Sequence, residues 1–197
     1  DALEEVNPET KVSLIEDLSD ELASDVIEEM EPDEAVDLLL DLPEEKKKEL
    51  IQTMERHKRV ELEELLKFKE GTAGSIMTPD FIACLQTDTA GKAMEIFKRS
   101  TDPLDNISYI YVKDHEEKLV GVITLRDLIL NQPEAPVDSF MNRRLVKLNT
   151  DDSVKEVAET FKKYKFLALP VVDEEDHMKG IITLRDGIEA ILPEFKE

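Results

Sequence analysis

The chain of 197 residues is 41% hydrophobic and 37% charged, with a formal net charge of −22. This is enough apolar material for one or two folded domains, which excludes a disordered chain, and no apolar run approaches the roughly 18 residues of a membrane helix. A phosphate backbone would be repelled by so acidic a protein unless a basic stripe overcame the field, and since the sequence has no such stripe we expect no nucleic-acid binding.

The negative charge is concentrated at the start of the chain. Residues 1–72 hold 24 acidic and 9 basic side chains and so carry −15 of the total charge. Such a run is typical of a solvated face, and it is also suited to gathering cations. The chain starts with Asp1 and has no basic and apolar leader, so we expect no signal peptide and a piece of a longer protein.

Apolar residues in this acidic region recur every twelve positions. A continuous helix would turn by about 120° between successive members of such a series, so the chain must break between them. Ser19, Pro32 and Pro43 stand where new helices would begin, each followed by acids. The pattern predicts a superhelical array of short α-helices over residues 10–70. The two series are Leu14, Val26, Leu38, Leu50 and Leu62, and Leu18, Met30, Leu42, Met54 and Leu66.

Glycines and small residues at Gly71 to Ser75 mark a domain boundary. The last helix before it, Val60 to Phe68, is expected to be longer than the other helices of the array. Beyond the boundary lie two similar halves, with Met77 matching Met141 at an offset of 64 and Gly121 matching Gly180 at an offset of 59. The five extra residues of the first half are placed at Ser100 to Asn106. The pattern of each half predicts an extended segment, a helix, two strands and a closing helix. The two halves therefore predict an α+β fold of β-α-β-β-α units. Cys84, the single cysteine, excludes a disulfide and predicts a small buried hydrophobe.

The phrases "GVITLRD" and "GIITLRD" end the second strand of each half. Thr124 and Thr183 occupy the N-cap position of the closing helix, with Asp127 and Asp186 three residues on, as in a capping box. The pattern serves helix capping equally well as ligand binding, in which a carboxylate near a helix start accepts the hydroxyls of a ribose. Two copies at matching places in a repeat strengthen the second interpretation.

The segments "MTPDF", "TDTAGKAMEIF" and "YIYVKDHEEKLVGVITLRD", with their second copies, resemble a pair of cystathionine-β-synthase (CBS) repeats. The preceding "MEPDEAVDLLLDLPEEKKKEL" and "GTAGSIMTPDF" resemble the intracellular N domain of the MgtE magnesium transporters. The resemblance implies an acidic helical N domain over residues 1–72, truncated at its N-terminus, a first CBS domain over 73–136 and a second over 137–197. It also implies a cytosolic regulatory region, in which Mg²⁺ between acidic faces closes the pore.

The resemblance places one Mg²⁺ site between the N domain and the second CBS repeat. Asp33 and Asp37 match N-domain acids, Asp186 matches the acid opposite, and Glu34 is a helper. Asp33 and Asp37 are four residues apart, so they can face one ion if the segment is helical. Ser153, Lys155 and Lys165 replace acids of the resembling proteins, so we expect one site rather than the full set of ions.

The resemblance also implies that an adenine nucleotide, ATP in particular, can be held between the repeats. The candidate residues are an aromatic pair that could flank the adenine ring, a threonine and a carboxylate for the ribose, an arginine for phosphate, and a second acid nearby: Tyr109 and Phe166, Thr124 and Asp127, Arg126, and Glu189. Core packing explains the two aromatic residues equally well. The twin site in the second repeat is less favoured, because Asp186 is assigned to the ion.

No catalytic motif is present, and His57, His115 and His177 are scattered, so we expect no enzyme. The family implies a homodimer through the CBS domains, a transmembrane pore domain in the full-length protein and a cytoplasmic location. Two alternatives stay open. A free-standing CBS adenine-nucleotide sensor would bind nucleotide without responding to Mg²⁺ alone, and a scaffold would use the helical array as a peptide-binding face.

Overall fold

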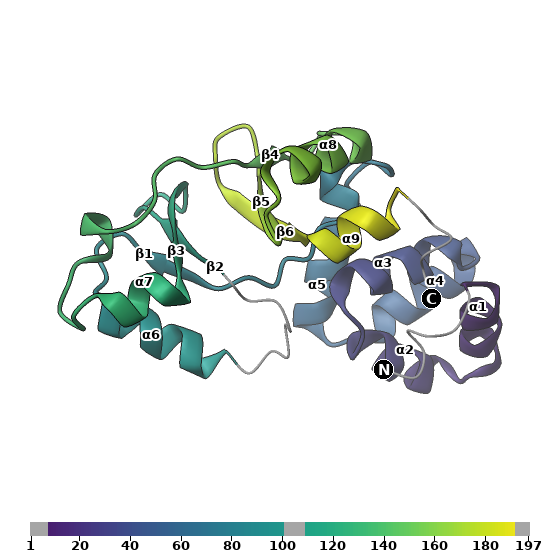
Figure 1. The fold of residues 1–197 in the computed structure, drawn as a ribbon. Helices are drawn as coiled ribbons and strands as arrows, with labels where there is room; N and C mark the ends of the chain where they lie inside the picture. Colours follow the sequence, from purple (N-terminus) through teal and green to yellow (C-terminus); the bar gives the residue numbers. More distant parts are fainter. Residues whose placement is uncertain (1–7, 101–108, 192–197) are drawn as a thin grey trace.

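The computed structural model describes residues 8–100 and 109–191 (Figure 1). The described chain begins with short helices: α1 (Pro8–Asp17), α2 (Asp20–Glu28), α3 (Pro32–Asp41), α4 (Glu44–Thr53) and α5 (Arg56–Leu65). Two three-stranded sheets with flanking helices follow, which confirms the predicted α+β class.

The helix starts agree with the sequence signals. Ser19 is the N-cap of α2, with its Oγ accepting from the backbone N–H of Leu22 at 3.5 Å, and Pro32 is the first residue of α3. Successive helices start twelve residues apart along the chain. Each helix packs against the next but one, α1 on α3, α2 on α4 and α3 on α5, so the helices form a stacked array. The expectation of a longer last helix was wrong, because α5 has ten residues, as α3 and α4 do.

The centre of the buried face differs from the predicted series in the first helices. Ile15 and Ile27 are fully buried, whereas the predicted Leu14 is 44% exposed. In α4 and α5 the predicted positions, Leu50 and Leu62, are fully buried. One position along a helix is about 100° of rotation, so equal spacing along the sequence did not fix how each helix is turned toward its neighbours.

Each half forms the predicted β-α-β-β-α unit. In each sheet the first strand is parallel to the second and the second is antiparallel to the third. The five extra residues expected at Ser100 to Asn106 fall, apart from Ser100, outside the described residues. The first repeat contains β1 (Ala83–Leu85), α6 (Ala90–Arg99), β2 (Tyr109–Lys113), β3 (Leu119–Thr124) and α7 (Leu125–Leu130), and the second contains β4 (Leu148–Asn149), α8 (Val154–Tyr164), β5 (Ala168–Val172), β6 (Met178–Thr183) and α9 (Leu184–Glu189).

The segment that leads into each repeat pairs with the sheet of the other repeat. Thr78 and Ile181 exchange two backbone hydrogen bonds, of 2.9 and 2.8 Å. Their equivalents Asn142 and Val122 do the same, at 3.1 and 2.9 Å. The two repeats are therefore tied together by reciprocal main-chain bonds.

This exchange explains the glycine in each copy of the repeated phrase. A Cβ added at Gly180 would lie 2.5 Å from the backbone oxygen of Thr78, and one added at Gly121 would lie 2.5 Å from Sδ of Met141. A glycine is needed where another segment approaches the backbone this closely. The glycine of the repeated phrase thus marks a close contact in both repeats, with the backbone of Thr78 at Gly180 and with the side chain of Met141 at Gly121.

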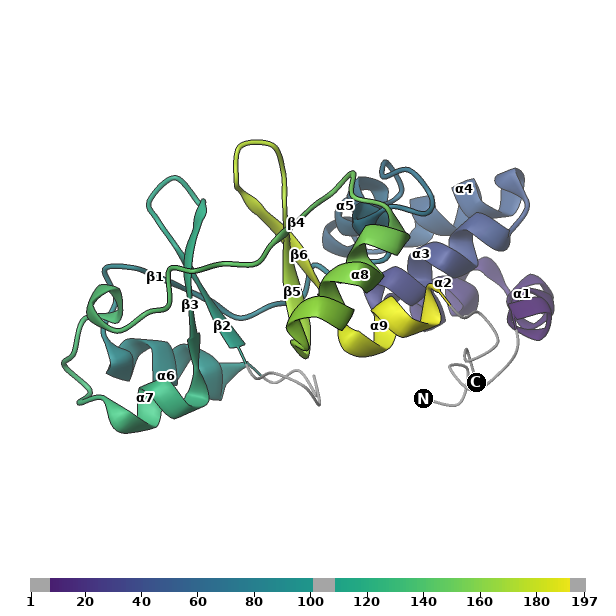
Figure 2. The ribbon, with the colours of Figure 1, turned by 45° about the horizontal axis from the view of Figure 1, so that its top comes forward.

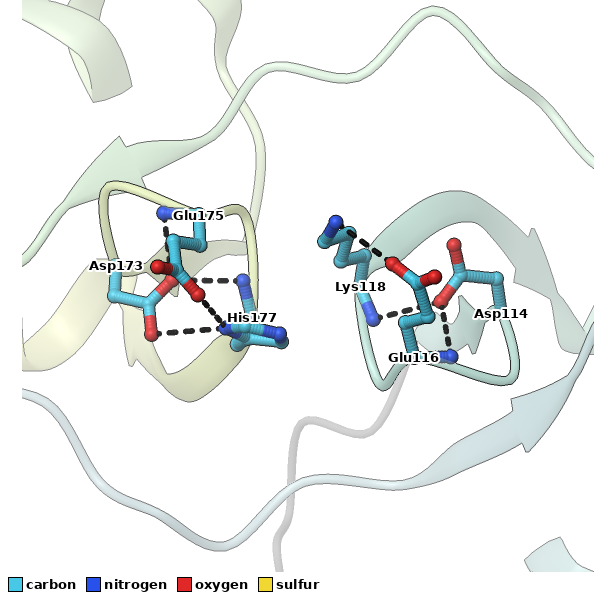
Figure 3. Close-up of polar contacts among 6 residues, drawn as sticks. All are labelled: Asp114, Glu116, Lys118, Asp173, Glu175 and His177. Atoms are coloured by element: carbon cyan, nitrogen blue, oxygen red, sulfur yellow. Dashed lines mark hydrogen bonds and ion pairs between the residues drawn. The ribbon is translucent and has the colours of Figure 1, made fainter.

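The hairpin turns of the two repeats lie side by side (Figure 3). In each turn an aspartate side chain accepts backbone N–H groups: Oδ1 of Asp114 accepts from Lys118 at 3.0 Å, and Oδ1 of Asp173 accepts from His177 at 2.9 Å. Lys118 forms a β-bridge with His177, its own equivalent in the other repeat. A residue paired with its equivalent marks a pseudo-two-fold axis between the repeats.

Among the described residues three apolar clusters form the core, and the largest runs from the helical array into the second repeat, joining Leu39 to Ile182. Accordingly, the array lies against α8 and α9 in both views, away from the first repeat (Figures 1 and 2). The second cluster fills the first repeat and includes Cys84, as expected, and the third lies between the two sheets. None of the helices within 8–100 and 109–191 is long and apolar enough to cross a membrane.

Candidate functional site

The first candidate site is the contact between α3 of the helical array and α9 of the second repeat, which lie beside each other in both views (Figures 1 and 2). Asp33 is in the first turn of α3 and Asp186 in the first turn of α9. Burial, and then the negative charge of Asp186, raise the pKa of Asp33 to about 7, and Glu34 and Glu31 add to the effect. Like charges therefore face each other across this contact.

The capping box of α9 fixes the position of Asp186. Its Oδ2 accepts from the backbone N–H of Thr183 at 2.8 Å, while Oγ1 of Thr183 accepts from the backbone N–H of Asp186 at 3.3 Å. The capping interpretation of this T-x-x-D pattern is therefore correct. It leaves the carboxylate held at the surface that the array covers, so capping and cation binding are compatible at this residue.

The three acids assigned to Mg²⁺ lie in different surroundings. Asp33 is close enough to Asp186 for their charges to interact, whereas Asp37, one turn further along α3, is exposed. In the part of the chain that the structure describes, no three or more His, Cys, Asp or Glu side chains converge as metal ligands. A cation between Asp33 and Asp186 would therefore keep much of its water, as Mg²⁺ commonly does.

The residues that replace family acids have structural positions. Ser153 is the N-cap of α8, where its Oγ and backbone N–H both donate to Oε2 of Glu156, at 2.7 and 2.8 Å. Lys165 ends the same helix in the left-handed conformation, with φ of 58°, and Lys155 is exposed. None of the three supplies a carboxylate, so the expectation of one Mg²⁺ site rather than several stays a prediction.

The second candidate site is a cavity of about 320 Å³ between the two repeats. It is lined by four of the residues assigned to nucleotide binding, Tyr109, Thr124, Asp127 and Phe166. The rings of Tyr109 and Phe166 meet edge to face, with centroids 6.4 Å apart. Such a pair can frame a flat base from two sides rather than sandwich it.

The carboxylate of the cavity is oriented by its own helix cap. Oδ2 of Asp127 accepts from the backbone N–H of Thr124 at 2.8 Å and from its hydroxyl at 2.7 Å. The side chain is thereby fixed in the cavity wall, where its carboxylate oxygens can accept hydrogen bonds from the hydroxyl groups of a sugar.

Two assigned residues do not line the cavity, and a basic residue that the sequence did not single out does. Arg126 and Glu189 are absent from the wall, and Oε1 of Glu189 is bound by Nε of Arg185 at 2.7 Å. Arg144, from the segment that leads into the second repeat, lines the cavity instead. A signal was present, since the equivalent of Arg144 in the first repeat, at the offset of 64, is Asp80.

Comparison with known proteins identifies both the helical array and the two repeats. The family model described as the MgtE intracellular N domain matches residues 1–71, and that of the CBS domain matches residues 73–134 and 137–193. A crystal structure of the soluble part of a magnesium transporter is 36% identical, covers 93% of this chain and 72% of that one, and superposes with a TM-score of 0.88. The chain belongs to the MgtE family of magnesium transporters.

Curated relatives of this MgtE chain are longer than it is. The magnesium transporter MgtE of Enterococcus faecalis is 41% identical over 131 residues, which are 66% of this chain and 29% of the relative. That of Thermus thermophilus is 37% identical over 139 residues, 71% of this chain and 31% of the relative. The MgtE chain thus spans less than a third of the transporters that it matches.

Two further comparisons concern the cavity and the repeats. The cytosolic domain of the Mg²⁺ channel MgtE in complex with ATP is 29% identical, covers 95% of this chain and 92% of that one, and gives a TM-score of 0.67. Inosine-5′-monophosphate dehydrogenase of Aquifex aeolicus is 36% identical over 134 residues, which are 26% of that enzyme. The likeness to the dehydrogenase rests on CBS domains.

Proposed function

We propose that this chain is the cytosolic regulatory region of a longer magnesium transporter, and that it senses intracellular Mg²⁺ and closes the pore when Mg²⁺ is abundant. The observation that carries the proposal is the opposition of Asp33 and Asp186 across the contact of α3 with α9. Two carboxylates in a partly buried contact repel each other, and a divalent cation between them replaces repulsion by attraction. We assign no catalytic role to the chain.

The apolar packing beside this contact makes the balance sensitive to the ion. Leu39 and Ile182 belong to one buried cluster that joins the array to the second repeat. Closure is therefore favoured by apolar burial and opposed by the facing acids. Since Mg²⁺ bound by few carboxylates is held weakly, we expect a response at about 10⁻³ M. Sensitivity in that range would suit a regulator of Mg²⁺ uptake.

Small-angle X-ray scattering in 0 to about 20 mM MgCl₂ tests this proposal, with KCl matching the ionic strength. We expect the radius of gyration to fall with Mg²⁺, because the array closes onto the second repeat. Asp33→Asn should weaken this response, since it removes one of the repelling charges, whereas Glu49→Gln, on the exposed surface of α4, should respond as the wild type does. A radius that KCl changes equally, or that stays constant, would contradict the proposed sensor.

We propose that the cavity between the repeats binds an adenine nucleotide such as ATP and so modulates the same region. The observation that favours this role is that Tyr109, Phe166 and Asp127 line the same cavity, where Arg144 supplies a positive charge. Calorimetric titration with ATP is the direct test. Binding of ATP by a protein that does not respond to Mg²⁺ would favour the free-standing nucleotide sensor, and no response to either ligand would favour the scaffold.

We further propose that two copies associate through the closing helices of their CBS repeats and that a pore domain continues the full-length chain. Ile129 and Leu130 of α7 are 74% and 71% exposed, and Ile188 of α9, the equivalent of Ile129, is 43% exposed. Apolar side chains gathered at equivalent places on both repeats suit an isologous interface with a second copy.

Ile129→Asp is therefore expected to shift the protein from dimer to monomer at micromolar concentration, because it places a charge in the proposed apolar interface. Sedimentation velocity measures the change. Leu22→Asp, at a 56% exposed position of α2, is the matched control and should leave the dimer intact. A wild-type chain that sediments as a monomer, or an Ile129→Asp variant that remains a dimer, would contradict this interface.

A further inference from the structure

Tyr111 is a buried polar residue in the wall of the cavity between the repeats. The side chain is 2% exposed and belongs to the apolar cluster between the two sheets. Its ring packs edge-on against Phe81, with centroids 6.2 Å apart. Within the described residues its hydroxyl oxygen is buried and has no hydrogen-bond partner. A buried hydroxyl without a partner is uncommon and unfavourable, so its position calls for an explanation.

The hydroxyl is available as a hydrogen-bond donor at physiological pH. Burial, and then the neighbouring Tyr109, raise the pKa of Tyr111 further above its ordinary value, so the phenol keeps its proton. A neutral phenol can donate one hydrogen bond and also accept. A ligand group that enters this end of the cavity would supply the partner that the hydroxyl does not find among the described residues.

The position of Tyr111 along β2 indicates which part of a ligand it would meet. Tyr109 pairs with Thr124, beside the carboxylate of Asp127, and Tyr111 pairs with Val122, one step further from that carboxylate. Residues two apart on a strand share a face and are about 7 Å apart. This separation is comparable to the reach of a purine from its sugar to its Watson–Crick edge, and a pyrimidine is shorter.

We propose that the Tyr111 hydroxyl hydrogen-bonds the Watson–Crick edge of a purine whose ribose lies at Asp127, and that it makes the cavity select purine over pyrimidine nucleotides. This inference rests on the nucleotide binding proposed above and adds the residue that reads the base. Because the hydroxyl oxygen is shielded from solvent, the inference requires that the part of the wall formed by Tyr111 shifts when the ligand binds.

Calorimetric titration of wild type and Tyr111→Phe with ATP and with CTP tests the inference. The wild type should bind ATP more tightly than CTP. Tyr111→Phe should bind ATP roughly fivefold more weakly, the size of one hydrogen bond, while its affinity for CTP stays unchanged. Tyr164→Phe, a tyrosine outside the cavity wall, is the matched control and should bind both nucleotides as the wild type does.

Thermal denaturation without ligand separates base recognition from a structural role. Removing a hydroxyl that has no partner should leave the melting temperature of Tyr111→Phe unchanged or raise it, whereas removing one that supports the fold should lower it. Equal ATP affinities of Tyr111→Phe and wild type would overturn the inference and leave nucleotide binding intact. Equal losses for ATP and CTP, or a lower melting temperature, would also overturn it. A wild type that binds neither nucleotide would contradict the proposed nucleotide role itself, and this inference with it.

Discussion

Replacing Gly180 by alanine is expected to lower the free energy of unfolding by about 2–3 kcal/mol, the upper part of the range for overpacked sites. The added Cβ would lie 2.5 Å from the backbone oxygen of Thr78, in the segment that the first repeat contributes to the sheet of the second. This oxygen accepts from the backbone N–H of Ile181, and the backbone N–H of Thr78 donates back to Ile181, so the Thr78 backbone cannot move aside without straining both hydrogen bonds. Thermal or urea denaturation measures the loss.

Gly121→Ala is the matched control for this effect, because the two glycines are equivalent in the repeats. Its Cβ would meet the side chain of Met141, with Sδ at 2.5 Å, and a methionine can change its rotamer. We therefore expect a loss of about 1 kcal/mol or less for Gly121→Ala. Equal losses at the two positions would contradict the account based on the backbone of Thr78.

Asp33→Asn is expected to stabilise the protein in the absence of Mg²⁺, and by more at pH 8 than at pH 5. Burial and Asp186 raise the pKa of Asp33 from 3.8 to about 7 in the folded state. The folded wild type therefore binds a proton more tightly than the unfolded chain, so its free energy of unfolding falls as the pH rises from about 4 to 7 and is level above. Asparagine has no such dependence.

The size of the effect follows from the pKa. A shift of three units corresponds to about 4 kcal/mol, and because Asp33 is partly exposed we expect roughly half of that at pH 8. Urea denaturation at pH 5 and pH 8 in a chelator, with and without the substitution, measures the difference. Adding Mg²⁺ at pH 8 should stabilise the wild type more than the variant. A difference between the two proteins that is the same at both pH values would contradict the proposed opposition of charges.

Local signals predicted the elements and the caps. The starts of α2 and α3 follow from Ser19, whose side chain caps the first turn of α2, and from Pro32, whose ring restricts the backbone at the first residue of α3. The capping boxes of Thr124 and Thr183 likewise involve residues three apart. Such interactions are complete within one turn of chain, so a sequence states them fully.

Contacts between distant segments could not be obtained in this way. The twelve-residue period identified the helices of the array, yet it chose Leu14 where Ile15 is buried, because the turn of each helix depends on its neighbours. Arg144 and Tyr111 reach the cavity from different repeats, and no local pattern brings them together. The assignment of Arg126 to the cavity followed the motif, and the fold places that residue outside the wall.

The sequence by itself determined the acidic array, the two repeats and the glycines and aspartates of the repeated phrase, because these depend on periodicity, capping and backbone geometry within short segments. Only the tertiary structure decided that the leading segments of the repeats are exchanged, that Arg144 rather than Arg126 lines the cavity, and that the hydroxyl of Tyr111 has no hydrogen-bond partner among the described residues. Each of these depends on which surfaces bury one another, which is a property of the packed chain rather than of any one segment.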